Sequence, residues 1–202
     1  MATNATTNKV NMNAADMDRH VYLDQQHTIA CHPSETLQRF MLRVLAWGLN
    51  ADPNLQFTKG VSTTEEPDLW TKSIIDDIEL WVELGLPDEK RIRKASHKAD
   101  KVIIYAYGDN AAPIWWQANK NKINVLDNVS VVFIRDEELQ ELEKVVERSM
   151  QLQLTIEGEQ AWLSASNANV TILPEWWKRQ FSINNVSLSV GDITHFCDIT
   201  PK

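Results

Sequence analysis

The sequence predicts a single α/β domain with added antiparallel strands, and three observations support this fold class. Between residues 77 and 149, strand-like and helix-like patterns alternate, which favours a parallel sheet covered by helices. Of the 202 residues, 43% are hydrophobic and 24% are charged, the usual balance of a globular protein. No internal repeat or linker-like stretch interrupts the chain before about residue 180. We therefore expect one domain over residues 1–180 and a polar extension over residues 181–202 that is only partly ordered.

Two strands and a long helix are predicted for the N-terminal part. Residues 9–15 and 20–31 favour strands that are joined by a tight turn at residues 15–18. The helix is expected to begin with Ser34 as its N-cap and Glu35 in its first turn. Its apolar residues recur at helical spacing and predict one buried stripe, made of Leu37, Phe40, Met41, Val44 and Leu45.

The next segments favour strands and helices in alternation. A short strand is expected at residues 55–61 and a helical turn at residues 65–72. Residues 77–85 give the strongest strand pattern, because apolar and other residues alternate along them. Pro87 is well placed to open a helix, and residues 101–107 are almost continuously apolar, as a buried strand would be.

The C-terminal third continues this order. A helix is expected at residues 111–121, a strand at 129–134 and a helix at 136–149. Residues 150–173 then favour strands again, with a hairpin turn at Glu157-Gly158-Glu159. The sequence therefore predicts a parallel layer with antiparallel additions.

Composition also excludes several classes of protein. No apolar run reaches the length that a membrane span needs, and the first residues lack the apolar core of a secretory signal. Cys31 and Cys197 lie far apart in the chain, so we expect free thiols and a cytoplasmic location. The six glycines never cluster, so neither a P-loop nor a G-x-G-x-x-G motif is present. No nucleotide cofactor is expected.

Charge is unevenly distributed along the chain. The net charge of −8 argues against nonspecific coating of nucleic acid, since such binding depends on lysine and arginine. Residues 88–101 nevertheless hold six lysines and arginines against three acids. The lysines fall on one side of the predicted helix and its end, at positions Lys90, Lys94, Lys98 and Lys101. This side is either a phosphate-binding face or the solvated face of an amphipathic helix.

Two groups of charged residues are candidates for a site. Glu79 and Glu83 lie on one face of the predicted strand, and carboxylates are ligands for Mg²⁺. Extended chain separates them by about 13 Å, so one ion needs a bulge or a further ligand. Glu35, Arg39 and Arg43 recur at helical spacing, which favours either a metal and phosphate site or a helix-stabilising charge ladder.

Several longer motifs resemble those of one family, the YaeQ family of bacterial proteins. They are His32-Pro-Ser-Glu-Thr, Arg43-Val-Leu-Ala-Trp47, Glu79-Leu-Trp-Val-Glu-Leu-Gly-Leu-Pro-Asp88 and Ile114-Trp-Trp-Gln117. The likeness runs from about Ala5 to Trp177. It implies a variant of the PD-(D/E)XK restriction-endonuclease-like fold, in which helices flank a mixed central sheet.

The resemblance also implies a site. In that superfamily an acid on one strand and an E-x-K triplet on the next hold Mg²⁺ and position the attacking water. Carried onto this chain, the metal ligands are Glu79, Glu83 and Glu35. Trp81 and Gly85 stand where the triplet would have its lysine. Some members move the lysine to the following helix, which would make Lys94 or Lys90 catalytic. The phosphates would then contact Arg39, Arg43 and Arg91.

Two functions follow from these residues. One is a degenerate nuclease-like site that binds nucleic acid or a protein partner, with transcription as one setting. The alternative is a Mg²⁺-dependent nuclease or phosphodiesterase with a migrated lysine. The missing E-x-K triplet favours the first, and the acids beside a basic helix favour the second.

Overall fold

The protein is described by a computed structural model that covers residues 6–58 and 65–180. Its elements, in chain order, are β1 (Thr6–Asp16), β2 (Val21–Cys31), α1 (Leu37–Leu49), β3 (Gln56–Phe57), β4 (Leu69–Lys72), β5 (Ile78–Leu84), α2 (Glu89–Lys98), β6 (Ala99–Tyr107), α3 (Ala111–Asn124), β7 (Val129–Ile134), α4 (Asp136–Glu143), β8 (Ser149–Glu157), β9 (Gln160–Ser164), β10 (Asn169–Ile172) and β11 (Glu175–Lys178). The mixed α/β class is confirmed. The predicted extension over residues 181–202 lies outside the described residues.

The strands form two mixed sheets. The larger has the order β11-β7-β6-β5-β4-β3, and its central strands β5, β6 and β7 are parallel. Helices α2 and α3 connect these strands, so the predicted parallel layer is confirmed. The smaller sheet has the order β10-β9-β8-β1-β2 and is antiparallel except where β1 pairs with β8. The antiparallel additions are therefore confirmed as well.

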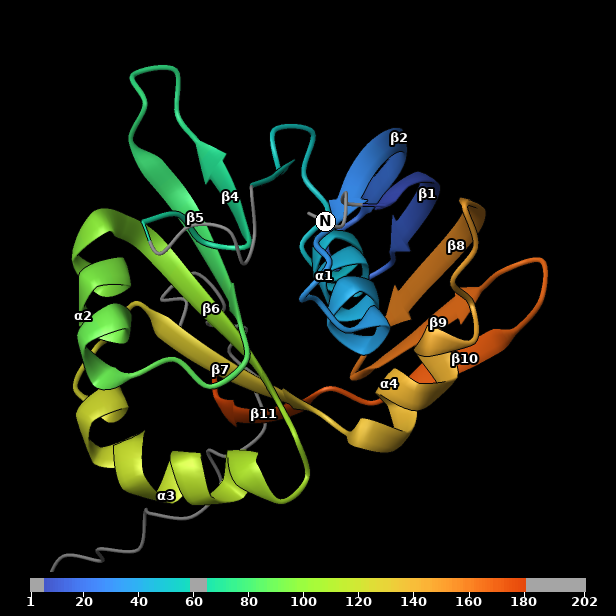
Figure 1. The fold of residues 1–202 in the computed structure, drawn as a ribbon. Helices are drawn as coiled ribbons and strands as arrows, with labels where there is room; N and C mark the ends of the chain where they lie inside the picture. The colour runs from blue at the N-terminus through green and yellow to red at the C-terminus, as the bar shows by residue number, and fades with distance from the viewer. Residues whose placement is uncertain (1–5, 59–64, 181–202) are drawn as a thin grey trace, which may run out of the picture.

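The elements stack in layers. Helix α1 lies between the two sheets, and α2 and α3 cover the outer face of the larger sheet (Figure 1). Every residue of α1 from Phe40 to Gly48 is buried, as expected for a helix with neighbours on all sides. Along β1, buried and exposed residues alternate, so the smaller sheet buries one face against α1 and leaves the other exposed.

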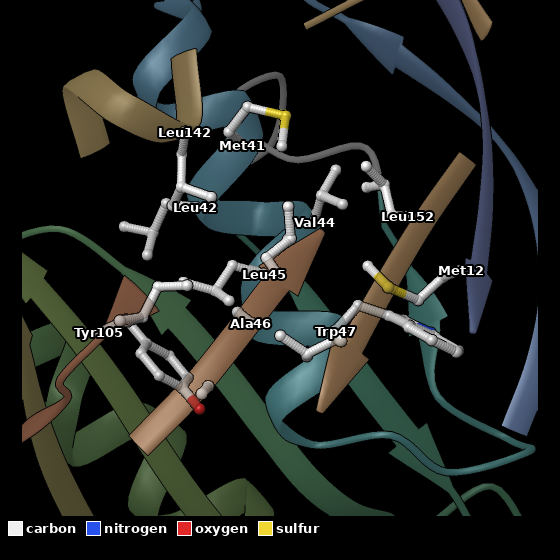
Figure 2. Packing of buried hydrophobic residues seen from close by; sticks show 14 of the residues in the cluster. Met12, Met41, Leu42, Val44, Leu45, Ala46, Trp47, Tyr105, Leu142 and Leu152 are labelled. Carbon is white, nitrogen blue, oxygen red and sulfur yellow. The ribbon is translucent and has the colours of Figure 1, made fainter. Parts of the chain in front are cut away.

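The main hydrophobic cluster is built around α1. Figure 2 shows Met41, Val44 and Leu45 projecting from this helix into a cluster that also holds Leu142 of α4 and Leu152 of β8. All five of these side chains are almost completely buried. Because α1 joins both sheets through this cluster, its two ends are held in fixed positions relative to the strands.

Three local predictions are wrong. The N-cap of α1 is Thr36, whose side chain accepts a hydrogen bond from the backbone of Arg39, so Ser34 and Glu35 precede the helix. Residues 69–72 form strand β4 rather than a helical turn, because they pair with β5. Helix α4 ends at Glu143 and not near residue 149, where β8 already begins.

Among the described residues, no helix is long and apolar enough to cross a membrane.

Candidate functional site

Six charged residues meet where the N-terminal end of α1 approaches the larger sheet. We call them the acid–arginine cluster, and its members are Glu35, Asp68 and Glu83 with Arg39, Arg43 and Arg91. The acids come from the turn before α1, from the residue before β4 and from the end of β5. The arginines come from α1 and α2. The fold therefore brings together residues that are far apart in the sequence.

Glu35 is the acid nearest to α1. The turn His32–Glu35 closes with a backbone hydrogen bond of 2.8 Å, which directs the Glu35 side chain inward. Its Oε1 accepts a hydrogen bond of 2.9 Å from Arg39 Nη1, and its Oε2 accepts one of 2.7 Å from Arg43 Nη2. Arg43 is only 3% exposed and also donates to the carbonyl of Ala30. The predicted charge ladder is thus a buried network rather than a solvated stripe.

Asp68 links α1 to the sheet. Its Oδ1 accepts a hydrogen bond of 2.7 Å from Arg39 Nη2, and its Oδ2 accepts one of 2.9 Å from the backbone N–H of Leu84. The side chain is 2% exposed. Burial by itself would lower the pKa of Arg39, but the nearby carboxylates of Asp68 and Glu35 raise it on balance. Arg39 therefore remains charged and bridges two acids.

Glu83 is held from the other side. Its Oε1 accepts a hydrogen bond of 2.7 Å from Arg91 Nε, and its Oε2 accepts one of 3.0 Å from Trp81 Nε1. Burial raises the pKa of Glu83 above its ordinary value, although the hydrogen bond and charge of Arg91 oppose that shift. Arg91 is thus the α2 side chain that reaches this acid.

The cluster does not fit a Mg²⁺ ion. Each of the six carboxylate oxygens already accepts a hydrogen bond, and five of the hydrogen-bonded groups belong to arginine or tryptophan side chains. Magnesium needs carboxylate oxygens that face a shared cation position, and here the guanidinium groups take that place. Among the described residues, no group of three His, Cys, Asp or Glu is arranged to hold a metal ion.

Other residues proposed from the sequence lie elsewhere. Glu79 lines a separate cavity at the opposite end of α1, so it does not join Glu35 and Glu83. Lys94 pairs with Glu65, and within the described ranges no ion pair joins Lys90 to an acid. Among the described residues, neither lysine forms an ion pair with Glu79 or Glu83. Glu79 and Glu83 lie four residues apart on β5, and the bulge in the β4–β5 pairing next to Glu79 does not bring them to one site.

The position of the missing lysine has an unusual backbone. Gly85 has a φ of +102°, a conformation that side chains with a Cβ rarely adopt. Its N–H donates a hydrogen bond of 2.9 Å to the carbonyl of Tyr105. A Cβ at this position would contact the ring of Tyr107 at 3.7 Å. Space is available there, but the dihedral angle disfavours lysine.

Asp68 is the member of the cluster that the sequence analysis missed. Residues 65–72 were expected to form a helical turn, and an acid in an exposed turn is not by itself a candidate for a functional site. The dipeptide Pro67-Asp68 just before a strand was the available signal, because the PD-(D/E)XK pattern begins with these two residue types. Arg91 was proposed for phosphates and instead pairs with Glu83.

Known proteins are similar to this chain over most of its length. The family model of the YaeQ protein matches residues 1–174. The uncharacterized protein YaeQ of Salmonella typhi is 45% identical over 179 residues, which are 89% of this chain and 99% of the relative. The corresponding protein of Escherichia coli K12 is 44% identical over 179 residues, with the same coverage.

Two solved structures match the fold. The crystal structure of YaeQ from Xanthomonas axonopodis pv. citri superposes with a TM-score of 0.85 at 34% identity and covers 87% of this chain and 99% of that one. YaeQ from Pseudomonas syringae gives a TM-score of 0.83 at 30% identity and covers 87% of this chain and 97% of that one. With the match of the family model, these similarities establish that the chain belongs to the YaeQ family.

Proposed function

We propose that this protein binds nucleic acid without cleaving it, on a fold that descends from PD-(D/E)XK nucleases. The observation that carries the proposal is the acid–arginine cluster. Asp68 directly precedes β4 and Glu83 lies on the neighbouring strand β5, as the acids of that pattern would, and Glu35 lies before the first helix. Arginines hold all three carboxylates. The cluster thus supports a structural role in this protein for the acids whose counterparts in a nuclease bind a metal.

Gly85 supports the loss of catalysis. The triplet Glu83-Leu84-Gly85 ends β5, where the pattern calls for a lysine to position the attacking water. The cation that approaches Glu83 is Arg91, and a guanidinium is a poor proton carrier because it stays protonated in proteins. A guanidinium that is bonded to a carboxylate stabilises the fold, but it does not activate water.

A cationic face of α2 supports binding to phosphates. This face consists of Lys94 and Lys98, which lie on one side of the helix beside Glu65. The pKa of Glu65 is lowered chiefly by its bond with Lys94, with smaller contributions from Lys98 and Arg91. The exposed Lys94–Glu65 pair is weak in water, so a phosphate can compete with the carboxylate for this lysine.

The net charge of −8 determines how strongly and how locally this protein would bind nucleic acid. A local cationic face on an acidic protein gives binding that weakens steeply with salt, since affinity comes from the release of counterions. It also restricts the contact to one side of the molecule, because the remaining surface repels the phosphate backbone. We therefore expect local, moderate affinity rather than coating of long duplexes.

Fluorescence anisotropy with short labelled single-stranded DNA, duplex DNA and RNA tests the proposal. The double variant Lys94→Glu, Lys98→Glu should abolish most binding. The matched control is Lys120→Glu, Lys144→Glu, which makes the same charge change on α3 and at the end of α4. Replacing two phosphate-contacting lysines removes about two units from the slope of log affinity against log salt.

The same samples are incubated with Mg²⁺ or Mn²⁺ and resolved on denaturing gels. Intact nucleic acid together with selective loss of binding in the α2 variant supports the proposal. Metal-dependent cleavage that disappears in Glu83→Gln would establish the nuclease alternative instead. If none of the three probes binds at low salt, the nucleic-acid function is wrong.

A further inference from the structure

A second site lies at the opposite end of α1 from the acid–arginine cluster. Here the two sheets diverge and leave a cavity of about 690 Å³. We call it the inter-sheet cavity. It is bounded by the C-terminal end of α1, by strands β5, β6 and β7, and by the β1–β2 and β8–β9 turns. Its volume falls in the range that accommodates small organic ligands.

Part of the wall of the inter-sheet cavity is apolar. This part is formed by Leu80, Ile103, Val132, Ile156 and Trp176. Trp176 is 39% exposed, although tryptophan is usually well buried. The guanidinium of Arg179 lies 4.7 Å from the centre of its ring, so this indole already has a cation on one face. Such walls favour a ligand with an apolar body.

Two buried polar side chains, Asn50 and Tyr105, line the cavity. They are 9% and 3% exposed. The Asn50 amide donates one hydrogen bond of 2.8 Å to the carbonyl of Ala46 and one of 2.7 Å to the Tyr105 hydroxyl oxygen. Both amide hydrogens are thereby used. Within residues 6–58 and 65–180, the Tyr105 O–H has no further acceptor and Asn50 Oδ1 has no donor. Neither atom is a fully buried polar atom left without any partner.

The Tyr105 O–H and Asn50 Oδ1 are therefore a donor and an acceptor available at the cavity. Polar atoms that line a cavity can bond to water or to a polar group of a ligand. Burial raises the pKa of Tyr105 to about 12, so its hydroxyl keeps its proton at neutral pH and remains a donor. A neutral hydroxyl or carbonyl group on a ligand would satisfy both side chains.

The rim of the cavity carries uncompensated negative charge. Of the six acids that line the cavity, Asp16 is bonded to Arg19 and Glu159 to Arg179. In the described part of the chain, the other four form no ion pair: Asp18, Asp52, Glu79 and Asp100. Lys101 is the cation at the rim that is not engaged by an acid of the described residues.

The backbone at the end of α1 adds to the negative electrostatic potential at the cavity. Helix α1 ends at Leu49 and its C-cap Asn50, both of which line the cavity. The C-terminal end of a helix carries partial negative charge and favours cations within about one turn. Arg19 already uses one of these positions, since its Nη2 donates to the Leu49 carbonyl at 3.1 Å.

From these features we propose that the inter-sheet cavity binds a small organic cation, namely an amine with an apolar body and one neutral hydroxyl or carbonyl group. The amine lies at the rim beside Asp18, Glu79 and Asp100. The body packs between the sheets, and the neutral polar group meets Tyr105 and Asn50. This site is distinct from the cationic face of α2 and does not depend on nucleic-acid binding.

Isothermal titration calorimetry with three matched compounds tests the site. Tyramine carries the amine, the ring and the hydroxyl group. Phenethylamine lacks the hydroxyl, and 3-(4-hydroxyphenyl)propionate replaces the cation with an anion. We expect tyramine to bind, phenethylamine to bind about fivefold more weakly, and the propionate not to bind at millimolar concentration.

Variants then assign the contacts. Glu79→Gln with Asp100→Asn should weaken tyramine several-fold, at about threefold for each carboxylate. The control is Asp24→Asn with Glu147→Gln, which makes the same charge change at exposed residues outside the cavity and should leave affinity unchanged. Tyr105→Phe should reduce tyramine to the affinity of phenethylamine and leave phenethylamine itself unaffected.

Three results would overturn the proposal: no heat with tyramine, equal binding of the propionate, or equal weakening in the control variant. Tyr105 is buried, so a thermal melt accompanies its variant. If Tyr105→Phe does not fold, the exposed carboxylate variants and the three compounds still decide the outcome.

Discussion

Met41→Ala and Leu37→Ala test how α1 is held between the sheets. Both residues belong to the apolar stripe that helical spacing predicts, so sequence alone expects similar losses of stability. The structure distinguishes them, because Met41 is 0% exposed and Leu37 is 42% exposed. Figure 2 shows Met41 directed into the cluster with Leu142. The two variants should therefore differ strongly.

The expected magnitudes follow from burial. Returning a fully buried methionine side chain to water costs about 1.5–3 kcal/mol, and the cavity that alanine leaves adds to this loss. Packing on all sides of α1 limits how far neighbours can move into the gap. We expect Met41→Ala to lower the free energy of unfolding by about 3 kcal/mol, within the usual range of about 2–5 kcal/mol. Leu37→Ala should cost less than about 1 kcal/mol.

Urea unfolding followed by circular dichroism gives both values from the midpoint and slope of each transition. The slopes should agree with that of the wild type, since neither change alters the surface exposed on unfolding by much. A loss below about 1 kcal/mol for Met41→Ala, or equal losses for the two variants, would refute the assignment of the buried face.

Two further predictions concern single ionisable groups. Thiol titration of the denatured chain should return both cysteines as free thiols. In the folded chain Cys31 should react slowly, because burial and then Glu35 raise the pKa of its thiol, and a disulfide would contradict this. Burial raises the pKa of Glu83 in the folded state, so its contribution to stability is complete below the unfolded pKa near 4.5 and is lost as pH rises through the folded pKa. Urea midpoints should therefore show the wild type losing stability relative to Glu83→Gln between about pH 4.5 and neutrality, and a relative gain would contradict the buried position of Glu83.

Local patterns predicted much of the fold. The order of β5, α2, β6, α3 and β7 follows from alternating apolar spacing, which neighbouring residues determine. Strand β4 could not be predicted in this way, because it is four residues long and exists through its pairing with β5. Intrinsic preference over so few residues is weaker than the pairing energy that tertiary structure supplies.

The candidate site was predicted only in part. Glu35, Arg39 and Arg43 were identified from their helical spacing, but a solvated ladder and a buried network have the same spacing. Asp68 joins them across 29 positions of sequence, a contact that periodicity does not record. Glu79 was grouped with Glu83 because both fit one strand face, and the bulge beside it was not visible in the residue pattern.

The left-handed backbone at Gly85 makes this position unfavourable for a lysine. The substitution Gly85→Lys would introduce backbone strain of about 1–3 kcal/mol at this dihedral angle, whatever contacts the new side chain made. The new side chain would also find Glu83 already bonded to Arg91 and Trp81. A lysine at position 85 would therefore need further changes around Glu83 before it could contact that carboxylate.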